Sequence, residues 1–492
     1  MATVSPSAAE GPLILTIDAG TSSTRAMLFD RSGRAVPGVV AQEQAEVYVS
    51  TEGASEQDPE QALALVERCV DAALAQAGPL ASAIGAVAVT TLVTTTMALD
   101  RAGRPLTGLI TYADTRATDD AVGLRRVLDE RAVHDRTGCL LRASYWPARL
   151  AWLRRERPDL WRAASRWVTL GEWLELRLFG QTRASYCAAS WSGLLDWRRL
   201  VWDAPLLEHL GLEPDALSPL VDRDAPLRGL AAPYAARWPA LRDLPWFPAV
   251  GDGAASNIGS GCAGPDRIAL NVGTSGALRT VLPEPARVPE GLWCYRLDRD
   301  AVLLGGATSE GGNVYAWMRD VLRLGEGEAL ERELAALPPD GHGLTVLPFL
   351  AGERSPGWAG DVRATISGLS LTTTPAEIAR AALESVAYRF ALILELMGGG
   401  DQTIVAGGGG VARSPLWLQI IADALGRPVV ASAEPETTSR GAALLALHAL
   451  GAIASPAAPA ELGVTYTPDP ARHTIYRAAI ARQRELYRLL IG

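Results

Sequence analysis

Apolar and polar positions follow a mixed strand and helix pattern over the first part of the chain. Apolar runs at 13–18, 24–30 and 35–41 predict three strands in a meander. The apolar spacing of 59–77 predicts an amphipathic helix, and the run 84–89 predicts a buried strand. This alternation predicts the α/β fold class.

Further along, the pattern changes twice. Helical, tryptophan-rich stretches cover 121–180, and the irregular segment 200–247 is expected to pack loops and short helices over a cleft. A strand pattern restarts at 266, which predicts a domain boundary near 263–266. Five tryptophans are expected in the core rather than in a stacking platform: Trp146, Trp152, Trp161, Trp167 and Trp173.

The length of the chain also indicates more than one domain. At 492 residues it exceeds the usual size of a single hydrophobic core. We expect an N-terminal domain over 12–264, a C-terminal domain over 265–455 and a helical tail over 456–492.

A strand–turn–strand signature occurs once in each half. An apolar strand runs into Gly-Thr-Ser at 20–22 and again at 273–275, and an apolar strand follows each turn. Glycine lets the backbone approach a ligand, and the turn's N–H groups and hydroxyls form an anion nest. One such turn could be an ordinary hairpin. Two turns in two halves predict a pair of related domains that bind a polyphosphate between them.

A glycine run in the second half resembles a nucleotide-approach loop. A strand beginning at Thr403 leads into four glycines at 407–410, and a helix is predicted over 414–425. Glycine-rich loops occur in many folds, so the signal is weak by itself. It gains weight because it shares a half with the second Gly-Thr-Ser turn.

Composition and charge exclude several classes of protein. A net charge of −9 gives no basic surface for nucleic acid, and no apolar run reaches membrane-spanning length. Residues 1–12 lack the regions of a signal peptide. The five cysteines are far apart and odd in number, which fits a reducing compartment and no metal spacing. We therefore expect a cytoplasmic protein with neither nucleic-acid nor membrane partners.

The sequence contains no lysine, and all 46 basic residues are arginine. A Walker A loop, a protein kinase and a pyridoxal enzyme each need a lysine, so these chemistries are excluded. No Gly-x-Ser-x-Gly elbow is present, which gives a serine hydrolase little support. If the protein handles ATP, it must use backbone groups, hydroxyls, arginine and a metal ion.

Two aspartates are candidates for the chemistry. Asp18 ends a buried strand beside the first turn, where a carboxylate suits Mg²⁺ better than a plain turn role, and the second turn has Asn271 in its place. Asp252 lies between two glycines at the predicted start of a helix. There it could accept a proton from a substrate hydroxyl or simply cap the helix, and spacing alone leaves these two interpretations equal.

Taken together, these elements resemble the FGGY carbohydrate kinases of the actin/hexokinase/heat-shock-protein-70 superfamily, over about 13–450. The segment 364–384 is similar to the C-terminal signature of the family, and 56–59 to its Glu-Gln-Asp-Pro. A weaker signature begins at Ser144, where Arg149 stands in place of the usual lysine. The resemblance implies two ribonuclease-H-like (actin-like ATPase) domains with a cleft between them, and the cofactors ATP and Mg²⁺.

The resemblance also implies roles for individual residues. Asp252 matches the catalytic base, and Asp18 would lie by the Mg²⁺. The positions implied for the ATP phosphates and nucleotide are Thr21, Ser22, Ser23, Arg25, Gly273, Thr274, Gly312, Gly410 and Ser414. The positions implied for the substrate are Val93, Thr94, Asp114, Ser144, Tyr145 and Asp252.

The substrate is less clear than the reaction. Val93-Thr94 fits neither the Met-His of xylulose kinases nor the Arg-Glu of glycerol kinases, while 111–116, 144–147, 311–314 and 350–358 resemble gluconate kinases. The Thr-rich run that starts at Thr94 departs from that group. Arg116 or Arg354 could pair with a substrate carboxylate, or both could be structural ion-pair partners.

We expect an ATP-dependent kinase of a small sugar or sugar acid, with D-gluconate first. A pentulose or polyol kinase is the alternative within this class, with xylulose, ribulose, glycerol and erythritol as its substrates. A nucleotide-binding regulator on the same fold is a rival from another class. The sequence leaves the oligomeric state open, with a homodimer among the options.

Overall fold

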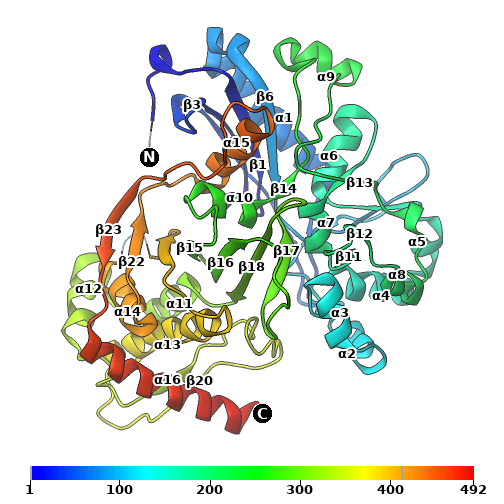
Figure 1. Ribbon diagram of the computed structural model, residues 1–492. Helices are drawn as coiled ribbons and strands as arrows, with labels where there is room; N and C mark the ends of the chain where they lie inside the picture. Colours follow the sequence, from blue (N-terminus) through cyan, green and yellow to red (C-terminus); the bar gives the residue numbers. More distant parts are fainter. Residues whose placement is uncertain (1–2, 412–413) are drawn as a thin grey trace.

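The computed structural model describes residues 3–411 and 414–492 and contains two main sheets (Figure 1). The first has the strand order β14-β6-β1-β2-β3. Its strands are β1 (Leu13–Ala19), β2 (Ser23–Phe29), β3 (Ala35–Gln44), β6 (Ile84–Thr91) and β14 (Val250–Gly251). Strand β1 pairs antiparallel with β2 and parallel with β6, and β2 pairs antiparallel with β3. The predicted meander is confirmed.

The second sheet repeats this arrangement in the other half of the chain. Its order is β17-β18-β16-β15-β21-β22-β23. Strand β15 pairs antiparallel with β16 and parallel with β21, as β1 does with β2 and β6. The strands are β15 (Arg267–Val272), β16 (Gly276–Leu282), β17 (Trp293–Arg296), β18 (Val302–Thr308), β21 (Thr403–Gly407), β22 (Val429–Ser432) and β23 (Leu462–Tyr466). The chain therefore has the two related α/β halves that the twin turns predict.

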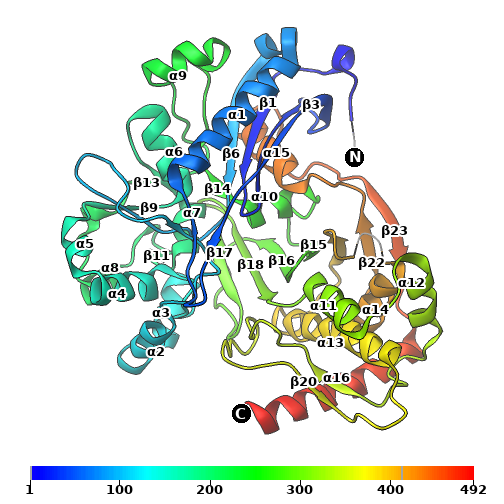
Figure 2. The same ribbon diagram turned by 180° about the vertical axis from the view of Figure 1, so that it is seen from behind.

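Two helices cover opposite faces of the first sheet. Helix α1 (Pro59–Ala77) packs on one face, which Figure 2 shows from behind, and α15 (Thr437–Ala449) packs on the other. Alternate side chains of β1 lie on opposite faces of the sheet. Leu15 packs in the hydrophobic cluster that contains α1, and Ile14 packs in the cluster that contains α15. Helix α15 comes from the stretch 265–455, so the second half of the chain returns to the first sheet.

Helix α15 also packs closely against α10 (Asp252–Gly259), which carries the candidate base. A Cβ atom at Gly441 would lie 1.8 Å from the carbonyl oxygen of Ala255, and one at Gly259 would lie 1.8 Å from that of Thr437. Real Cβ atoms do not approach backbone so closely. The two glycines therefore let the backbones of these helices touch, which fixes the position of α10.

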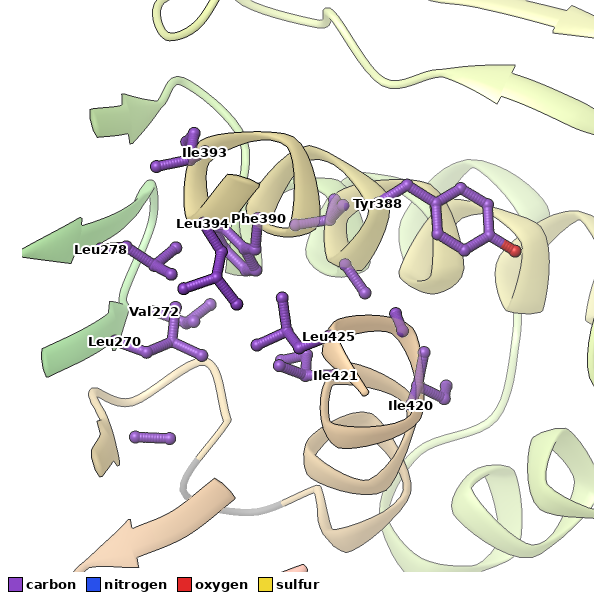
Figure 3. Packing of buried hydrophobic residues seen from close by; sticks show 14 of the residues in the cluster. Leu270, Val272, Leu278, Tyr388, Phe390, Ile393, Leu394, Ile420, Ile421 and Leu425 are labelled. Atoms are coloured by element: carbon purple, nitrogen blue, oxygen red, sulfur yellow. The ribbon is translucent and has the colours of Figure 1, made fainter. Parts of the chain in front are cut away.

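The core of the second half lies between its sheet and two long helices. Helix α13 (Pro375–Leu396) and helix α14 (Pro415–Leu425) pack against β15 and β16 (Figure 3). Buried members of this cluster include Leu270, Val272, Leu278, Phe390, Ile393, Ile420 and Ile421. Thr374 begins α13 with a capping box, accepting from the Glu377 N–H while the Glu377 carboxylate accepts from the Thr374 N–H.

The remaining elements of the first half are short. They are η1 (Pro6–Ala8), β4 (Tyr48–Val49), β5 (Ser55–Gln57), η2 (Gly78–Ala83), β7 (Met97–Leu99), β8 (Leu109–Ile110), α2 (Thr118–Val127), α3 (Glu130–Thr137), α4 (Trp146–Glu156), α5 (Pro158–Ala163), β9 (Arg166–Val168), α6 (Leu170–Phe179), β10 (Ala184–Ser185), α7 (Tyr186–Ser192), β11 (Leu195–Asp196), β12 (Val201–Trp202), α8 (Ala204–Leu210), η3 (Pro214–Ala216), β13 (Leu220–Val221), α9 (Ala232–Arg237) and η4 (Pro239–Leu241). Segment 200–247 is irregular as predicted. Of the five tryptophans, Trp146, Trp167 and Trp173 are buried in the core as predicted, whereas Trp152 and Trp161 are half-buried and pack against it.

The second half adds α11 (Gly312–Leu322), α12 (Gly327–Ala336), β19 (Thr345–Leu347), β20 (Thr365–Ser367) and α16 (Pro470–Leu490). Helix α16 confirms the predicted helical tail, but strand β23 precedes it and pairs with β22, which the sequence analysis did not predict. Within 3–411 and 414–492, no helix has the length and apolar character needed to cross a bilayer.

Candidate active site

The glycines of the second half meet beside the second Gly-Thr-Ser turn. The N–H of Gly312 donates to the carbonyl of Gly273 at 2.7 Å, and the N–H of Gly410 donates to the carbonyl of Val272 at 2.8 Å. A Cβ atom at Gly312 would lie 2.9 Å from the Gly273 oxygen. Three backbone segments thus converge, and only glycine fits at Gly312 and Gly410, whereas a Cβ atom at Gly273 would meet open space. Their contact with a nucleotide stays a prediction.

The first turn is held by the Glu-Gln-Asp-Pro segment. The side-chain amide of Gln57 donates to the carbonyl of Thr21 at 2.9 Å, and Asp58 caps α1 by accepting from the Gln61 N–H. The side chain of Ser22 is exposed, while Thr21 and Ser23 are half-buried. The turn therefore presents hydroxyls next to an anchored backbone, as a phosphate site requires.

Asp18 lies at the end of β1 near the other candidate carboxylate. Its Oδ1 accepts a hydrogen bond from the Thr90 hydroxyl at 2.8 Å. Burial raises the pKa of Asp18 to about 6, the Thr90 hydrogen bond lowers it, and the charge of Asp252 raises it further. A divalent cation would favour the ionised form of this carboxyl, so the donor chemistry fits Mg²⁺.

Arg25 forms an ion pair with Glu436 in this structure. Its Nη1 contacts the Glu436 carboxylate, just before α15, and it also lies close enough to lower the pKa of Asp18. The contact links strand β2 of the first turn to the segment that leads into α15. Any contact of Arg25 with a phosphate stays a prediction, and it would compete with Glu436 for the guanidinium.

Asp252 is the first residue of α10, directly after strand β14. Gly251 is the N-cap residue, and among the described residues the Asp252 Oδ1 accepts only from the Gly253 N–H, at 2.7 Å. Burial raises the pKa of Asp252, while the Gly253 N–H and the charge of Arg279 lower it. The side chain is not the N-cap of its helix, so the position gives the capping interpretation less support than the sequence did.

A cavity of about 180 Å³ connects Asp252 to the second turn. Its lining residues include Asp252, Asn271, Gly273, Ser275 and Arg279. An adjoining cavity of about 660 Å³ shares Asn271 and Arg279 and extends along the glycine run 407–409. The candidate base and one phosphate turn therefore face a common space.

The predicted substrate positions Val93 and Thr94 lie beside this helix start. A Cβ atom at Gly251 would lie 2.6 Å from Cγ1 of Val93, so the two residues are in contact. Thr94 adopts a left-handed backbone with φ of 59°, and its buried hydroxyl has no hydrogen-bond partner in the described part of the chain. An unsatisfied buried hydroxyl costs free energy, which a hydroxylated substrate would recover.

Arg149 holds the segment that carries Thr94. Its fully buried guanidinium donates to the carbonyls of Thr94 and Thr111 and, at 3.1 Å, to the Thr96 hydroxyl. Burial lowers the pKa of Arg149 to about 9. The arginine that replaces the family's lysine thus positions the Thr-rich run.

Replacing Arg149 by Met should lower the free energy of unfolding by about 1–3 kcal/mol, because buried carbonyls lose their donor. Urea unfolding of the variant beside Arg363→Met, at an exposed arginine, measures the effect. Equal midpoints for the Arg149 variant and the unmodified protein would contradict the positioning role.

Asp114 and Arg116 are engaged with each other. Asp114 is buried, accepts from the Ser55 N–H at 2.9 Å and pairs with Arg116 at 2.7 Å. Arg116 also pairs with Glu56 and stacks on Trp152, 4.4 Å from the ring centre. For Arg116, the structure favours the interpretation as a structural ion-pair partner. A substrate contact of Asp114 stays a prediction.

Ser144 is half-buried, and Tyr145 belongs to an aromatic cluster that sequence analysis missed. The hydroxyls of Tyr145 and Tyr295 are hydrogen-bonded, and Trp191 stacks on Tyr295 with ring centres 3.7 Å apart. Burial raises the pKa of Tyr145. The indole nitrogen of Trp191 has no partner among the described residues and lies 2.9 Å from a Cβ atom placed at Gly251. This donor is therefore next to Asp252.

Two predicted positions of the nucleotide site have different surroundings. Thr274 is exposed at the second turn, and its carbonyl accepts from the Asn313 N–H at 3.2 Å. Ser414 caps α14, accepting from the Trp417 N–H, and donates to Glu331 at 2.9 Å. The hydroxyl of Ser414 is thus occupied, and a nucleotide contact by it stays a prediction.

Comparison with known proteins places this geometry in a family. Residues 13–259 match the N-terminal domain, and residues 268–450 the C-terminal domain, of the FGGY family of carbohydrate kinases. A gluconokinase of Bacillus subtilis (strain 168) is 30% identical over 498 residues, covering 97% of this chain and 95% of that protein. A glycerol kinase of Polaromonas sp. is 32% identical over 471 residues, covering 88% of this chain and 90% of that protein.

A solved structure gives the same result for the fold. The ligand-bound xylulose kinase from Lactobacillus acidophilus superposes with a TM-score of 0.90 at 24% identity, covering 98% of each chain. The two halves therefore have the actin-like ATPase fold, and the relatives imply the use of ATP and of a small sugar as substrate. This chain belongs to the FGGY family of carbohydrate kinases.

Proposed function

We propose that this kinase transfers the γ-phosphoryl group of ATP to a primary hydroxyl of a small open-chain sugar acid, with D-gluconate, giving 6-phosphogluconate, as the first candidate. The observation that carries the proposal is the common cavity of Asp252 and the second phosphate turn. The similarity to a gluconokinase supports the choice of D-gluconate. The similarity to a glycerol kinase keeps a polyol or pentulose as the alternative.

In this mechanism Asp252 accepts the proton of the attacking hydroxyl. Burial raises the pKa of its carboxyl, which makes it a stronger base than an exposed aspartate. The Gly-Thr-Ser turns of the two halves hold the phosphates with backbone N–H groups and hydroxyls. The two halves, which we place at 12–264 and 265–455, close over the substrate and exclude water.

Asp18 would hold Mg²⁺, which neutralises charge on the phosphates when it is bound. Asp18→Asn should raise the Mg²⁺ concentration needed for half-maximal activity about ten-fold or more, because the amide carries no charge. Titration of Mg²⁺ at fixed ATP measures the effect, with Asp119→Asn, at an exposed aspartate, as the matched control. An unchanged Mg²⁺ requirement would contradict the metal role of Asp18.

Coupled ADP release tests the substrate. The panel contains D-gluconate, xylulose, ribulose, glycerol, rhamnulose and erythritol, each with ATP and Mg²⁺. Turnover on D-gluconate with little on the others is the expected result. Preferred turnover on a ketose or polyol would leave the kinase mechanism in place and discard D-gluconate. We expect a cytoplasmic enzyme, and gel filtration would test for a homodimer.

A further inference from the structure

Arg279 lines the same cavity as Asp252 and has no anionic partner in contact. Its guanidinium carbon lies 3.4 Å from a Cβ atom placed at Gly253. Within the described residues Arg279 makes no hydrogen bond or ion pair, and its buried Nε is unsatisfied. Burial lowers the pKa of Arg279, while the charge of Asp252 raises it. A buried donor without a partner costs free energy, so this side chain is available to a ligand.

Arg354 is a second cation, on a segment that is hydrogen-bonded to the strands beside this cavity. The N–H of Ser355 donates to the carbonyl of Ala307 at 2.8 Å, and Ala307 pairs with Ala277, which lines the cavity. The charge of Arg354 contributes to lowering the pKa of Arg279. The charge of Arg354 also contributes to lowering the pKa of Tyr145 and the pKa of Tyr295. Arg354 makes no side-chain hydrogen bond or ion pair in the described chain.

Two neighbouring guanidinium groups repel each other, and an anion between them would remove the repulsion. In contrast, Arg116 pairs with Asp114, and Arg389 pairs with Glu353. We propose that Arg279 and Arg354 form the carboxylate subsite of an aldonic acid substrate, an inference that rests on the proposed kinase function. Planar guanidinium groups suit bidentate contacts with a carboxylate.

The subsite fits a substrate carboxylate better than an ATP phosphate. Arg279 is three residues beyond Gly276 and lines the same cavity as the second turn, so an ATP phosphate is the competing occupant, and ATP binding is measured for that reason. The carbonyl of Arg354 accepts from the N–H of Trp358, whose ring centre lies 6.5 Å from that of Tyr145, a predicted substrate position. An aldonic acid carries its carboxylate and its terminal hydroxyl at opposite ends. Since Arg279 lies beside Gly253, the bound acid would fold back, with its terminal hydroxyl at Asp252 and its carboxylate at the arginine pair.

Direct binding tests this subsite without requiring turnover. Calorimetric titrations measure D-gluconate, the matched neutral hexitol D-glucitol and ATP separately. The proteins are the unmodified chain, Arg279→Gln, Arg354→Gln and the exposed control Arg363→Gln, each checked for an unchanged thermal unfolding midpoint. Both variants should weaken D-gluconate binding by about ten-fold to a hundred-fold, the loss expected for a charge-assisted hydrogen bond. D-glucitol and ATP binding should change little, and Arg363→Gln should behave as the unmodified protein.

The outcomes separate this inference from the kinase assignment. Unchanged D-gluconate affinity in both variants, or a loss of ATP affinity instead, would overturn the carboxylate subsite even if the protein phosphorylates D-gluconate. Failure of the unmodified protein to bind D-gluconate would overturn it too, while turnover of a ketose or polyol would keep the kinase function. If no sugar stimulated ADP release by the unmodified protein, the kinase function itself would be contradicted. The binding data would still show whether the two arginines bind the carboxylate.

Discussion

Replacing Asp252 by Asn is expected to lower kcat about 10²- to 10⁴-fold while ATP binding is retained, because the amide keeps the shape of the side chain but cannot accept the proton. Asp252 shares its cavity with the second Gly-Thr-Ser turn, and its only hydrogen bond in the described chain is the one it accepts from the Gly253 N–H. Steady-state ADP release with saturating sugar measures kcat. The shift of the thermal unfolding midpoint by ATP reports nucleotide binding.

The capping interpretation of Asp252 predicts a different result. Asparagine also suits a helix start, so a capping role would leave activity near normal in Asp252→Asn. Asp119→Asn, at an exposed aspartate, controls for the substitution itself. Near-normal kcat in the Asp252 variant would refute its role as the base and leave the phosphate turns without a known proton acceptor.

Gly441→Ala is expected to destabilise the protein by about 3 kcal/mol or more, because overpacking against rigid backbone cannot be relieved by moving one side chain. The added Cβ would lie 1.8 Å from the carbonyl of Ala255 and 2.9 Å from the N of Gly259. Helices α10 and α15 must therefore separate. Since Asp252 begins α10, the variant should also lose activity before it unfolds. Urea unfolding and ADP release on the same sample measure both effects.

Gly123→Ala is a matched control for this prediction. Gly123 lies within helix α2, and apart from its chain neighbours and the backbone of its own helix no described atom lies within 4 Å of an added Cβ. The same substitution there should stabilise the helix slightly, since alanine has the higher helix propensity. If Gly441→Ala unfolds at the same urea concentration as Gly123→Ala, the close packing of α10 and α15 does not position the base.

Much of the scaffold could be predicted because local pattern determines it. The strands around Asp18, the helix over 59–77 and the twin turns each depend on residues close together in the sequence. The return of α15 to the first sheet could not be predicted, because an apolar helix does not indicate which sheet it covers. Strand β23 was missed for a related reason: its pairing with β22 depends on a neighbour distant in the sequence.

The candidate site was predicted unevenly. Motif spacing singled out Asp18, Asp252 and both turns. It left open whether Arg116 pairs with the substrate or with structural carboxylates, and it did not predict that Ser414 caps a helix. Arg279 was also missed. One signal was present, a single arginine in the apolar strand after the second turn, but its meaning depends on which face of the strand meets Asp252. Only the tertiary structure shows which face of the strand that is.

Sugar-dependent ADP release by the unmodified protein, measured beside Asp252→Asn, tests the central claim most directly. The account predicts that D-gluconate stimulates ADP release in the presence of ATP and Mg²⁺ and that the variant loses this stimulation while it still binds ATP. ADP release that no sugar, polyol or sugar acid of the panel stimulates, or a variant that turns over like the unmodified protein, would contradict it.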